Sequence, residues 1–314
     1  MSLLVTGASG QFGRLVLSEL LDVHGIPGEQ IIATTRTPAR LAEFARRGVR
    51  IRAADFRDPA SLQNAFTGAS RLLLISTTVD EMPFVDGIRL RLHAAAIDAA
   101  SHAGVQHILY TSGPNPEPGT AAFWLADHYN TELALLNSGL AWTVLRHWEW
   151  PDWHLSMLWL RAVMTGYYFA GSGKGTSNHV TREDCASAAA AALLSHASVN
   201  RRYDMTGPRP LSIEEIMATL SDISGKSIRV EHGTPEEFEA HLLADGVDPL
   251  LVPVFGGYAR AVRQGRYSGT TPDVEELTGR KPTTLRQFLA RNATAILEAA
   301  RRGESNPGTI THSR

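Results

Sequence analysis

The chain has 314 residues, of which 43% are hydrophobic, so it can bury a sizeable core, and its formal net charge of −2 favours neither nucleic acid nor an anionic membrane as a partner. No apolar run approaches the roughly 20 residues that a membrane-spanning helix requires. The single cysteine, Cys185, excludes an internal disulfide framework and favours the reducing conditions of the cytoplasm.

The first predicted element is a short buried strand that runs into a glycine-rich turn. Residues 3–5 are apolar, glycines follow at positions 7, 10 and 13, and apolar residues then recur at helical spacing over 15–20. This order suits the phosphates of a dinucleotide, because Gly7 permits a tight turn, Gly10 lets the backbone approach a pyrophosphate and Gly13 lets the helix pack on the strand. The N–H groups at the start of the helix would then face the phosphates. Three glycines alone are equally compatible with an ordinary loop.

Strands and helices alternate through the first half of the chain. The predicted strands cover 30–35, 49–54, 71–76, 107–112 and 142–146, and the predicted helices between them cover 38–46, 59–66, 85–103 and 122–136. Such alternation with short links is typical of βαβ units and predicts an α/β fold with a doubly wound, parallel Rossmann-type sheet. Ligands of this fold bind at the carboxyl ends of the strands. The residues at those ends are Gly7, Arg36, Asp55, Ser76, Thr77, Thr111, His147 and Trp148.

The second half of the chain is less regular and predicts a smaller C-terminal substrate lobe. A strand over 167–170, a helix over 183–194 and a strand over 202–205 are predicted to return to the sheet. Further helices are predicted over 212–224, 235–243, 249–266 and 285–301. We therefore expect a dinucleotide-binding domain over 1–150 that also includes parts of 165–210, a substrate lobe formed mainly by 151–302, and a disordered tail over 303–314, which lacks apolar periodicity.

The residues after the second strand indicate which dinucleotide binds. An NAD site places a carboxylate here for the ribose hydroxyl, whereas an NADP site places a cation for the 2′-phosphate. The chain has Arg36 at this point and Arg40 one helical turn later, with no acidic residue between them. Because arginine binds phosphate through paired hydrogen bonds, we predict NADPH and NADP+ as the cofactor pair. Two solvated surface arginines are the alternative.

Asp55 and Phe56 end the third predicted strand, where an adenine ring would lie. The Asp55 carboxylate could accept a hydrogen bond from the exocyclic amine of the adenine, and Phe56 could pack on the ring. A helix N-cap and a core phenylalanine explain the same two residues equally well.

A proton donor is harder to identify than the cofactor. Short-chain dehydrogenases use a Tyr-x-x-x-Lys pair on one helix, but Lys174, Lys226 and Lys281, the lysines of this chain, have no tyrosine four residues earlier. His128, on the helix after the fifth strand, is a candidate acid because histidine titrates near neutral pH; a hydrogen-bonding or packing role is the alternative. Tyr129 beside it lacks a lysine four residues later and is a candidate substrate contact. The histidines lack the spacing of a zinc-binding helix, so no metal site is predicted.

Aromatic residues gather after the sixth predicted strand. All six tryptophans lie between positions 124 and 159, and the segment 148–153 stands beside the expected nicotinamide end of the cofactor. A flat aromatic substrate could stack on Trp148 or Trp150, although core packing explains such residues equally well.

The most specific pattern in the chain is a combination of segments: 6–13 (TGASGQFG), 36–40 (RTPAR), 54–56 (ADF), 72–76 (LLLIS), 110–112 (YTS), 125–132 (LADHYNTE), 143–146 (TVLR) and 181–186 (TREDCA). This combination resembles the NmrA-like branch of the atypical short-chain dehydrogenases, and within it the group of NADPH:quinone oxidoreductase 2 and triphenylmethane reductase. The resemblance covers most of residues 3–300.

The resemblance implies an NADPH-dependent reductase that transfers a hydride to a quinone or another conjugated aromatic acceptor. Members of the group also lack the Tyr/Lys pair. The chain departs from them over 147–150, where His-Trp-Glu-Trp replaces Asn-Gly-Trp-Tyr, so the identity of the acceptor stays open. The cofactor contacts that the resemblance implies are Gly7, Ser9, Gly10, Gln11, Phe12, Gly13, Arg36, Ser76, Thr77 and the segment 147–151, which begins with His147 and Trp148.

Two other functions stay open at this point. The family includes regulators that bind NADP(H) without turnover and act through a protein partner, and a reductase or isomerase of a specialised metabolite is a further alternative. For an enzyme we expect a small-molecule aromatic or quinone substrate, no nucleic-acid or membrane partner, and either a monomer or a homodimer.

Overall fold

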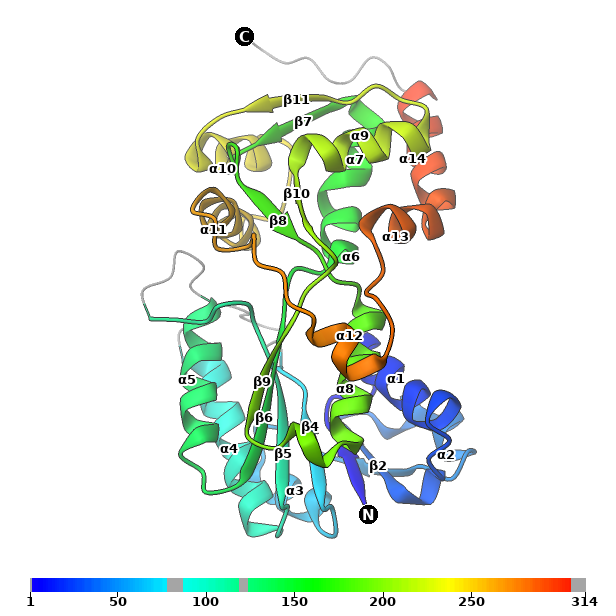
Figure 1. The fold of residues 1–314 in the computed structure, drawn as a ribbon, viewed down its shortest axis with the longest axis vertical. Helices are drawn as coiled ribbons and strands as arrows, with labels where there is room; N and C mark the ends of the chain where they lie inside the picture. The colour runs from blue at the N-terminus through cyan, green and yellow to red at the C-terminus, as the bar shows by residue number, and fades with distance from the viewer. Residues whose placement is uncertain (1, 78–86, 119–123, 306–314) are drawn as a thin grey trace.

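The computed structural model describes residues 2–77, 87–118 and 124–305, which form two lobes stacked along the long axis of the molecule (Figure 1). The lower lobe in this view holds a seven-stranded sheet and the N-terminus, and the upper lobe is mainly helical. The tail predicted over 303–314 lies outside the described residues from position 306 onward. Residues 303–305 belong to the last helix rather than to a disordered tail, because the apolar face of that helix packs against the upper lobe.

The central sheet is parallel throughout and confirms the predicted Rossmann-type α/β fold. Its strand order is β3-β2-β1-β4-β5-β6-β9. The order reverses between β1 and β4, which opens a crevice at the carboxyl ends of these two strands. The strands are β1 Leu3–Val5, β2 Ile31–Thr35, β3 Arg50–Ala53, β4 Arg71–Leu74, β5 His107–Ser112, β6 Ala141–His147 and β9 Arg201–Met205.

Helices cover both faces of the sheet, and the strands at its centre, β2, β1, β4 and β5, are buried on both sides. Leu3 and Val5 pack in the hydrophobic cluster on one face of the sheet, whereas Leu4 packs in the cluster on the opposite face. The helices on the first face are α1 Gln11–Ser18 and α8 Arg182–Leu194, and those on the opposite face are α3 Pro59–Phe66, α4 Ile88–His102 and α5 Trp124–Leu136. Shorter helical pieces are η1 Glu19–Val23, η2 Gly28–Gln30, η3 Pro38–Leu41, α2 Ala42–Ala45 and η5 His196–Ser198.

The upper lobe surrounds a second hydrophobic core that includes Trp159, Leu220 and Phe255. The same lobe contains two small sheets. In one, β7 Tyr167–Ala170 pairs in parallel with β11 Arg229–His232; in the other, β8 Thr176–Asn178 pairs antiparallel with β10 Pro210–Ser212. Its helices are α6 Pro151–His154, η4 Leu155–Trp159, α7 Leu160–Thr165, α9 Ile213–Ser224, α10 Pro235–Ala244, α11 Val252–Arg263, α13 Leu285–Arg291 and α14 Ala293–Ser305.

The C-terminal part of the chain is tied back to the sheet lobe. Helix α12 (Asp273–Thr278) packs against α8 and β9 (Figure 1). Just beyond it, the fully buried carboxylate of Asp184 in α8 accepts hydrogen bonds from the Arg280 guanidinium at 2.6 Å and from the backbone N–H of Thr283 at 2.7 Å. The two lobes therefore share a polar anchor as well as apolar packing.

The structure departs from the sequence predictions mainly in the upper lobe. The helical segment 151–165, the strands β8, β10 and β11, and helix α12 have no counterpart among the predictions. The helix predicted over 285–301 is two helices, because the backbone leaves helical geometry at Asn292, whose side chain bonds the carbonyl of Phe288. The starts predicted for the helices 85–103 and 122–136 lie outside the described residues.

Candidate active site

A cleft of about 800 Å³ opens at the carboxyl ends of β1 to β4, on both sides of the point where the strand order reverses. Ligands of doubly wound sheets bind at this point. Among the residues singled out from the sequence, the cleft is lined by Gly7, Ser9, Gly10, Gln11, Phe12, Gly13, Arg36, Arg40, Asp55, Phe56, Ser76, Thr77 and Trp150.

The glycine turn has the geometry that a phosphate site needs. Gly7 has a φ of +57°, which residues with a Cβ rarely adopt, and its carbonyl accepts a hydrogen bond from the N–H of Gly10 at 3.0 Å. A Cβ on Gly13 would lie 2.7 Å from the Gly7 oxygen, so only glycine lets α1 approach the turn this closely. The N-cap of α1, Gly10, offers no side chain to its N–H groups, and no acid lies in the first turn. This helix start therefore fits an anionic phosphate.

Arginines border the cleft beyond β2. Arg36 and Arg40 line it with exposed side chains, as the cofactor prediction requires. Arg14, in α1, lines it too; its guanidinium donates to the backbone oxygen of Arg40 at 2.8 Å and pairs with Glu43. Arg14 was not among the predicted site residues, although its position directly after Gly13 was a usable signal. Arg14 holds the backbone from which Arg40 projects.

Asp55 and Phe56 lie half-buried at the β3 end of the cleft. The Asp55 carboxylate accepts a hydrogen bond from the backbone N–H of Arg57 at 2.9 Å, and the N-cap of α3 is Asp58. The helix-cap alternative for Asp55 is therefore wrong, while its contact with an adenine stays a prediction. The Phe56 ring meets the His93 ring edge-on, with 6.4 Å between the centroids.

Aromatic and cationic side chains form the wall of the cleft nearest β6. The Trp150 ring stacks on Phe12 with 5.7 Å between centroids, and the Arg182 guanidinium lies 4.7 Å from the Trp150 centroid. Arg182 also bonds the side chain of Gln11 and comes within 3.5 Å of Asp152. Sequence reasoning missed this contact because Gln11 and Arg182 are 171 positions apart. The start of α8 thus covers one end of the glycine turn.

His147 and Trp148 are not among the described residues that line the cleft. Burial lowers the pKa of His147 to about 3, so the ring is neutral, and it packs against Phe12 with 5.0 Å between centroids. Trp148 is 5% exposed, its Nε1 donates to Asp204 at 3.1 Å, and its ring lies edge-on to Tyr267. The structure places Trp148 in the core behind the cleft wall, because the chain turns after β6 and only Trp150 reaches the opening.

His128, Tyr129 and Thr111 also stand back from the lining of the cleft in the described part of the chain. The His128 Nε2 lies 3.3 Å from the Arg89 guanidinium, and its Nδ1 lies 2.7 Å from the Tyr110 hydroxyl. A guanidinium can only donate, so Nε2 carries the lone pair and Nδ1 the proton. Burial, with Arg89 next, lowers the pKa of His128 well below its ordinary value. The ring is a neutral imidazole whose proton faces the buried Tyr110.

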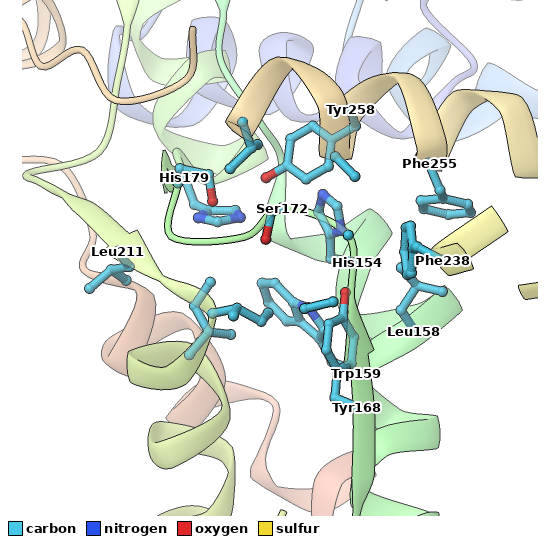
Figure 2. A pocket seen from close by; sticks show the side chains of 18 residues that line it. His154, Leu158, Trp159, Tyr168, Ser172, His179, Leu211, Phe238, Phe255 and Tyr258 are labelled. Carbon is cyan, nitrogen blue, oxygen red and sulfur yellow. The ribbon is translucent and has the colours of Figure 1, made fainter. Parts of the chain in front are cut away.

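A second, smaller cavity lies in the upper lobe (Figure 2). His154 and Tyr258 line it in contact with each other, 4.7 Å apart between centroids, with Trp159 and His179 among the other lining residues. Its volume of about 30 Å³ is small beside the 800 Å³ of the cleft. Both ring nitrogens of His179 lack a partner among the described residues, and burial lowers its pKa to about 3. The cleft at the strand ends, which is far larger, is therefore the candidate site.

The described residues contain no cluster of three His, Cys, Asp or Glu side chains that could hold a metal ion. Within the same residues, none of the helices has the length and the apolar character needed to cross a membrane.

Comparison with known proteins agrees with this site. Residues 7–196 match the model of a family described as NAD(P)H-binding. Quinone oxidoreductase 2 of Escherichia coli (strain K12) is 30% identical over 287 residues, which span 91% of this chain and 96% of that protein. The chain belongs to the NmrA-like, NAD(P)H-binding oxidoreductases. The resemblance stated from the sequence motifs is thereby confirmed.

Two further relatives of this NmrA-like oxidoreductase cover nearly its whole length. NAD(P)H azoreductase of Xenophilus azovorans is 26% identical over 300 residues, 94% of this chain and 99% of that protein. The structure of Citrobacter sp. triphenylmethane reductase complexed with NADP(H) is similar to the present one, with a TM-score of 0.84 and 30% sequence identity. The matched region spans 95% of this chain and 100% of the triphenylmethane reductase chain. Both similarities extend through the upper lobe as well as the sheet.

Proposed function

We propose that this oxidoreductase uses NADPH to reduce quinone-like or other conjugated aromatic acceptors in the cytoplasm. The observation that carries the proposal is the composition of one continuous cleft. Its glycine turn and helix start fit a pyrophosphate, arginines stand beyond β2, and the half-buried Trp150 lines the opposite wall. The names of the relatives, quinone oxidoreductase, azoreductase and triphenylmethane reductase, all describe reduction of conjugated acceptors.

The residues beyond β2 support NADPH over NADH. A 2′-phosphate placed between Arg36 and Arg40 gains charge-assisted hydrogen bonds, whereas residues 34–42 hold no carboxylate for the 2′-hydroxyl of NADH, and the next acid, Glu43, pairs with Arg14. Asp55, the nearest acid in the described lining, stands at the end of β3 and bonds the backbone of Arg57.

The chemistry that remains for the protein is positioning. The bound dinucleotide supplies a hydride at its nicotinamide. Trp150 and Phe12 offer a flat apolar wall on which an aromatic acceptor can stack, and Arg182 adds a positive charge beside it. Hydride addition to a quinone yields an aromatic hydroquinone anion that water can protonate. Such acceptors need little acid catalysis, which suits a chain without a Tyr-x-x-x-Lys pair and with a neutral, enclosed His128.

The test is NADPH consumption with a panel of benzoquinones, naphthoquinones, an azo dye and a triarylmethane dye, alongside a simple ketone. We expect turnover with members of the first four classes and none with the ketone. Efficient reduction of the ketone would reveal a proton donor that this account lacks. Tight NADPH binding without turnover of any acceptor would favour the alternative, an NADP(H)-sensing regulator.

A further inference from the structure

The backbone that leaves β4 is held by side chains instead of by neighbouring strands. The N–H of Ile75 donates to the Thr6 hydroxyl at 2.9 Å, and the N–H of Ser76 donates to the Thr111 hydroxyl at 2.8 Å. The N–H of Thr77 donates to His93 Nε2 at 3.1 Å. These three backbone residues line the cleft. Every N–H along this part of the wall therefore has a fixed partner behind it.

The histidine in this arrangement has only one workable protonation state. A backbone N–H can only donate, so His93 Nε2 must carry the lone pair and Nδ1 the proton. Nδ1 lies 3.1 Å from the Thr131 hydroxyl, which in turn donates to the Asp127 carbonyl at 2.7 Å. His93 is fully buried, and burial, followed by the charge of Arg89, lowers its pKa to about 3. The chain of donors is complete and runs in one direction, from Thr77 to α5.

Arg89 holds the other side of the same residue. Its Nε donates to the carbonyl of Thr77 at 3.1 Å, and its Nη1 lies 3.3 Å from His128 Nε2. His128 in turn directs its Nδ1 proton to the Tyr110 hydroxyl. Arg89, His128 and Tyr110 are all at least nine-tenths buried. Both polar backbone groups of Thr77 are thus fixed by side chains of α4, which are themselves oriented by α5 and β5.

We propose that His93 and Arg89 are positioning residues that fix the Thr77 backbone as the wall against which the nicotinamide half of the cofactor is aligned. The strand order supports this place, because β4 lies on the β5 and β6 side of the switch point, opposite the half formed by β2 and β3 where Arg36 and Asp55 stand. The expected effect on hydride transfer rests on the proposed function. The alignment of the bound cofactor can be tested by ligand affinity alone. The same arrangement also gives His128 a role in orienting Arg89 in place of proton donation.

The experiment compares His93→Phe, which removes the acceptor for the Thr77 N–H, with His93→Gln, which can restore one. The readouts are the affinity for NADPH, the affinity for 2′,5′-ADP and the single-turnover rate of hydride transfer to a quinone. We expect His93→Phe to bind 2′,5′-ADP within about twofold of the wild type and to lose roughly 10- to 100-fold in hydride transfer, the scale of a misaligned reacting group. His93→Gln should recover most of that loss.

His107→Phe is the matched control, since His107 is also buried and bonds a threonine hydroxyl, that of Thr143 at 2.8 Å, but stands at the amino end of β5. An equal loss of hydride transfer in His107→Phe, or an equal loss of affinity for NADPH and 2′,5′-ADP in His93→Phe, would overturn the proposal. If His93→Phe does not fold, Arg89→Leu takes its place, because it removes the donor to the Thr77 carbonyl; unchanged hydride transfer in that variant would count against the proposal.

The two proposals can fail separately. If the wild type reduces no acceptor, the proposed function fails. The ratio of the NADPH and 2′,5′-ADP affinities in His93→Phe then still decides the inference: a loss confined to NADPH supports it, and no loss or a loss common to both ligands rejects it.

Discussion

Arg36 is the residue on which cofactor choice depends. It lines the cleft beyond β2 with an exposed side chain that a 2′-phosphate can reach. We expect Arg36→Ala to weaken NADPH binding by about 1.5 kcal/mol, the lower end for charge-assisted hydrogen bonds because the site is exposed, and to leave NADH binding nearly unchanged. Calorimetry with both cofactors measures this directly. Equal losses for NADPH and NADH would remove Arg36 from the role.

Trp150 and Trp148 are two positions apart and should behave differently when each is replaced by alanine. Trp150 is half-buried on the cleft wall, so Trp150→Ala should raise KM for aromatic acceptors and leave NADPH affinity largely intact. Trp148 is in the core, so Trp148→Ala should instead cost about 3–5 kcal/mol of stability. Steady-state kinetics and urea unfolding of both variants give the comparison. If the two variants change KM alike, the assignment of Trp150 to the cleft wall and of Trp148 to the core is wrong.

Replacement of His128 tests whether the reaction uses this residue as an acid catalyst. Its ring is neutral and its pKa is depressed far below the physiological range, so it cannot release a proton to a substrate near pH 7. We expect His128→Gln to lower kcat modestly, through a less well oriented Arg89, without altering the shape of the pH profile between pH 6 and 8. A profile that flattens in the variant would restore His128 as a proton donor.

At the scale of elements, the anchor between α8 and the segment after α12 depends on Asp184. This carboxylate is fully buried and satisfies the Arg280 guanidinium and the Thr283 N–H. Asp184→Ala leaves the buried N–H of Thr283 without a partner, and we expect a loss of about 2–4 kcal/mol. Asp245, which pairs with the partly exposed Arg161 at 2.7 Å, is the control and should lose less than about 1 kcal/mol as alanine. Similar losses measured by urea unfolding would show that burial of the pair has no special effect.

The elements that could be predicted from the sequence are those with a local signal. β1, β2, β4, β5 and β6 each contain a short run of apolar residues that is buried on both faces, and the glycine turn lies within a single segment of the sequence. β8, β10 and β11 have three or four residues each, too few to show a periodic pattern, and they are fixed by partners far away in the chain.

The same distinction holds within the site. Arg36 follows its strand directly and could be predicted from spacing. Arg182 reaches Gln11 only through the fold, and His93 acts on Thr77 from another element, so neither contact has a signature in the local sequence. Trp148 and Trp150 look alike in the sequence, and only the turn of the backbone after β6 separates the core residue from the cleft residue.

For the molecule as a whole, buried histidines make stability sensitive to acid. Burial lowers the pKa values of His93, His147 and His179 to about 3 and of His107 to about 4, and that of His128 also lies well below its ordinary value. Below about pH 6.5 the unfolded chain therefore binds protons that the folded chain does not, so the free energy of unfolding falls as the pH falls.

Each such histidine lowers the free energy of unfolding by about 1.4 kcal/mol per pH unit over this window. Between about pH 6.5 and 5 the combined loss is comparable with the total stability of a typical protein. We expect the urea midpoint to drop steeply from pH 7 to pH 5. His179→Phe, outside the cleft, should reduce the slope by the equivalent of about one proton. A midpoint that stays level down to pH 5 would contradict the assignment of neutral buried rings.

The return of the chain to the sheet, with α8 and β9 completing a lobe begun by residues 3–147, has a consequence for synthesis. When β6 leaves the ribosome, the face later covered by α8 is bare and β6 is an open edge, until about 60 further residues have been made. At ordinary rates of translation this interval lasts about 3 to 12 s, long compared with the microseconds in which a chain collapses. The nascent protein is therefore an expected client of chaperones that bind exposed apolar surface, at least until Met205 has joined the sheet.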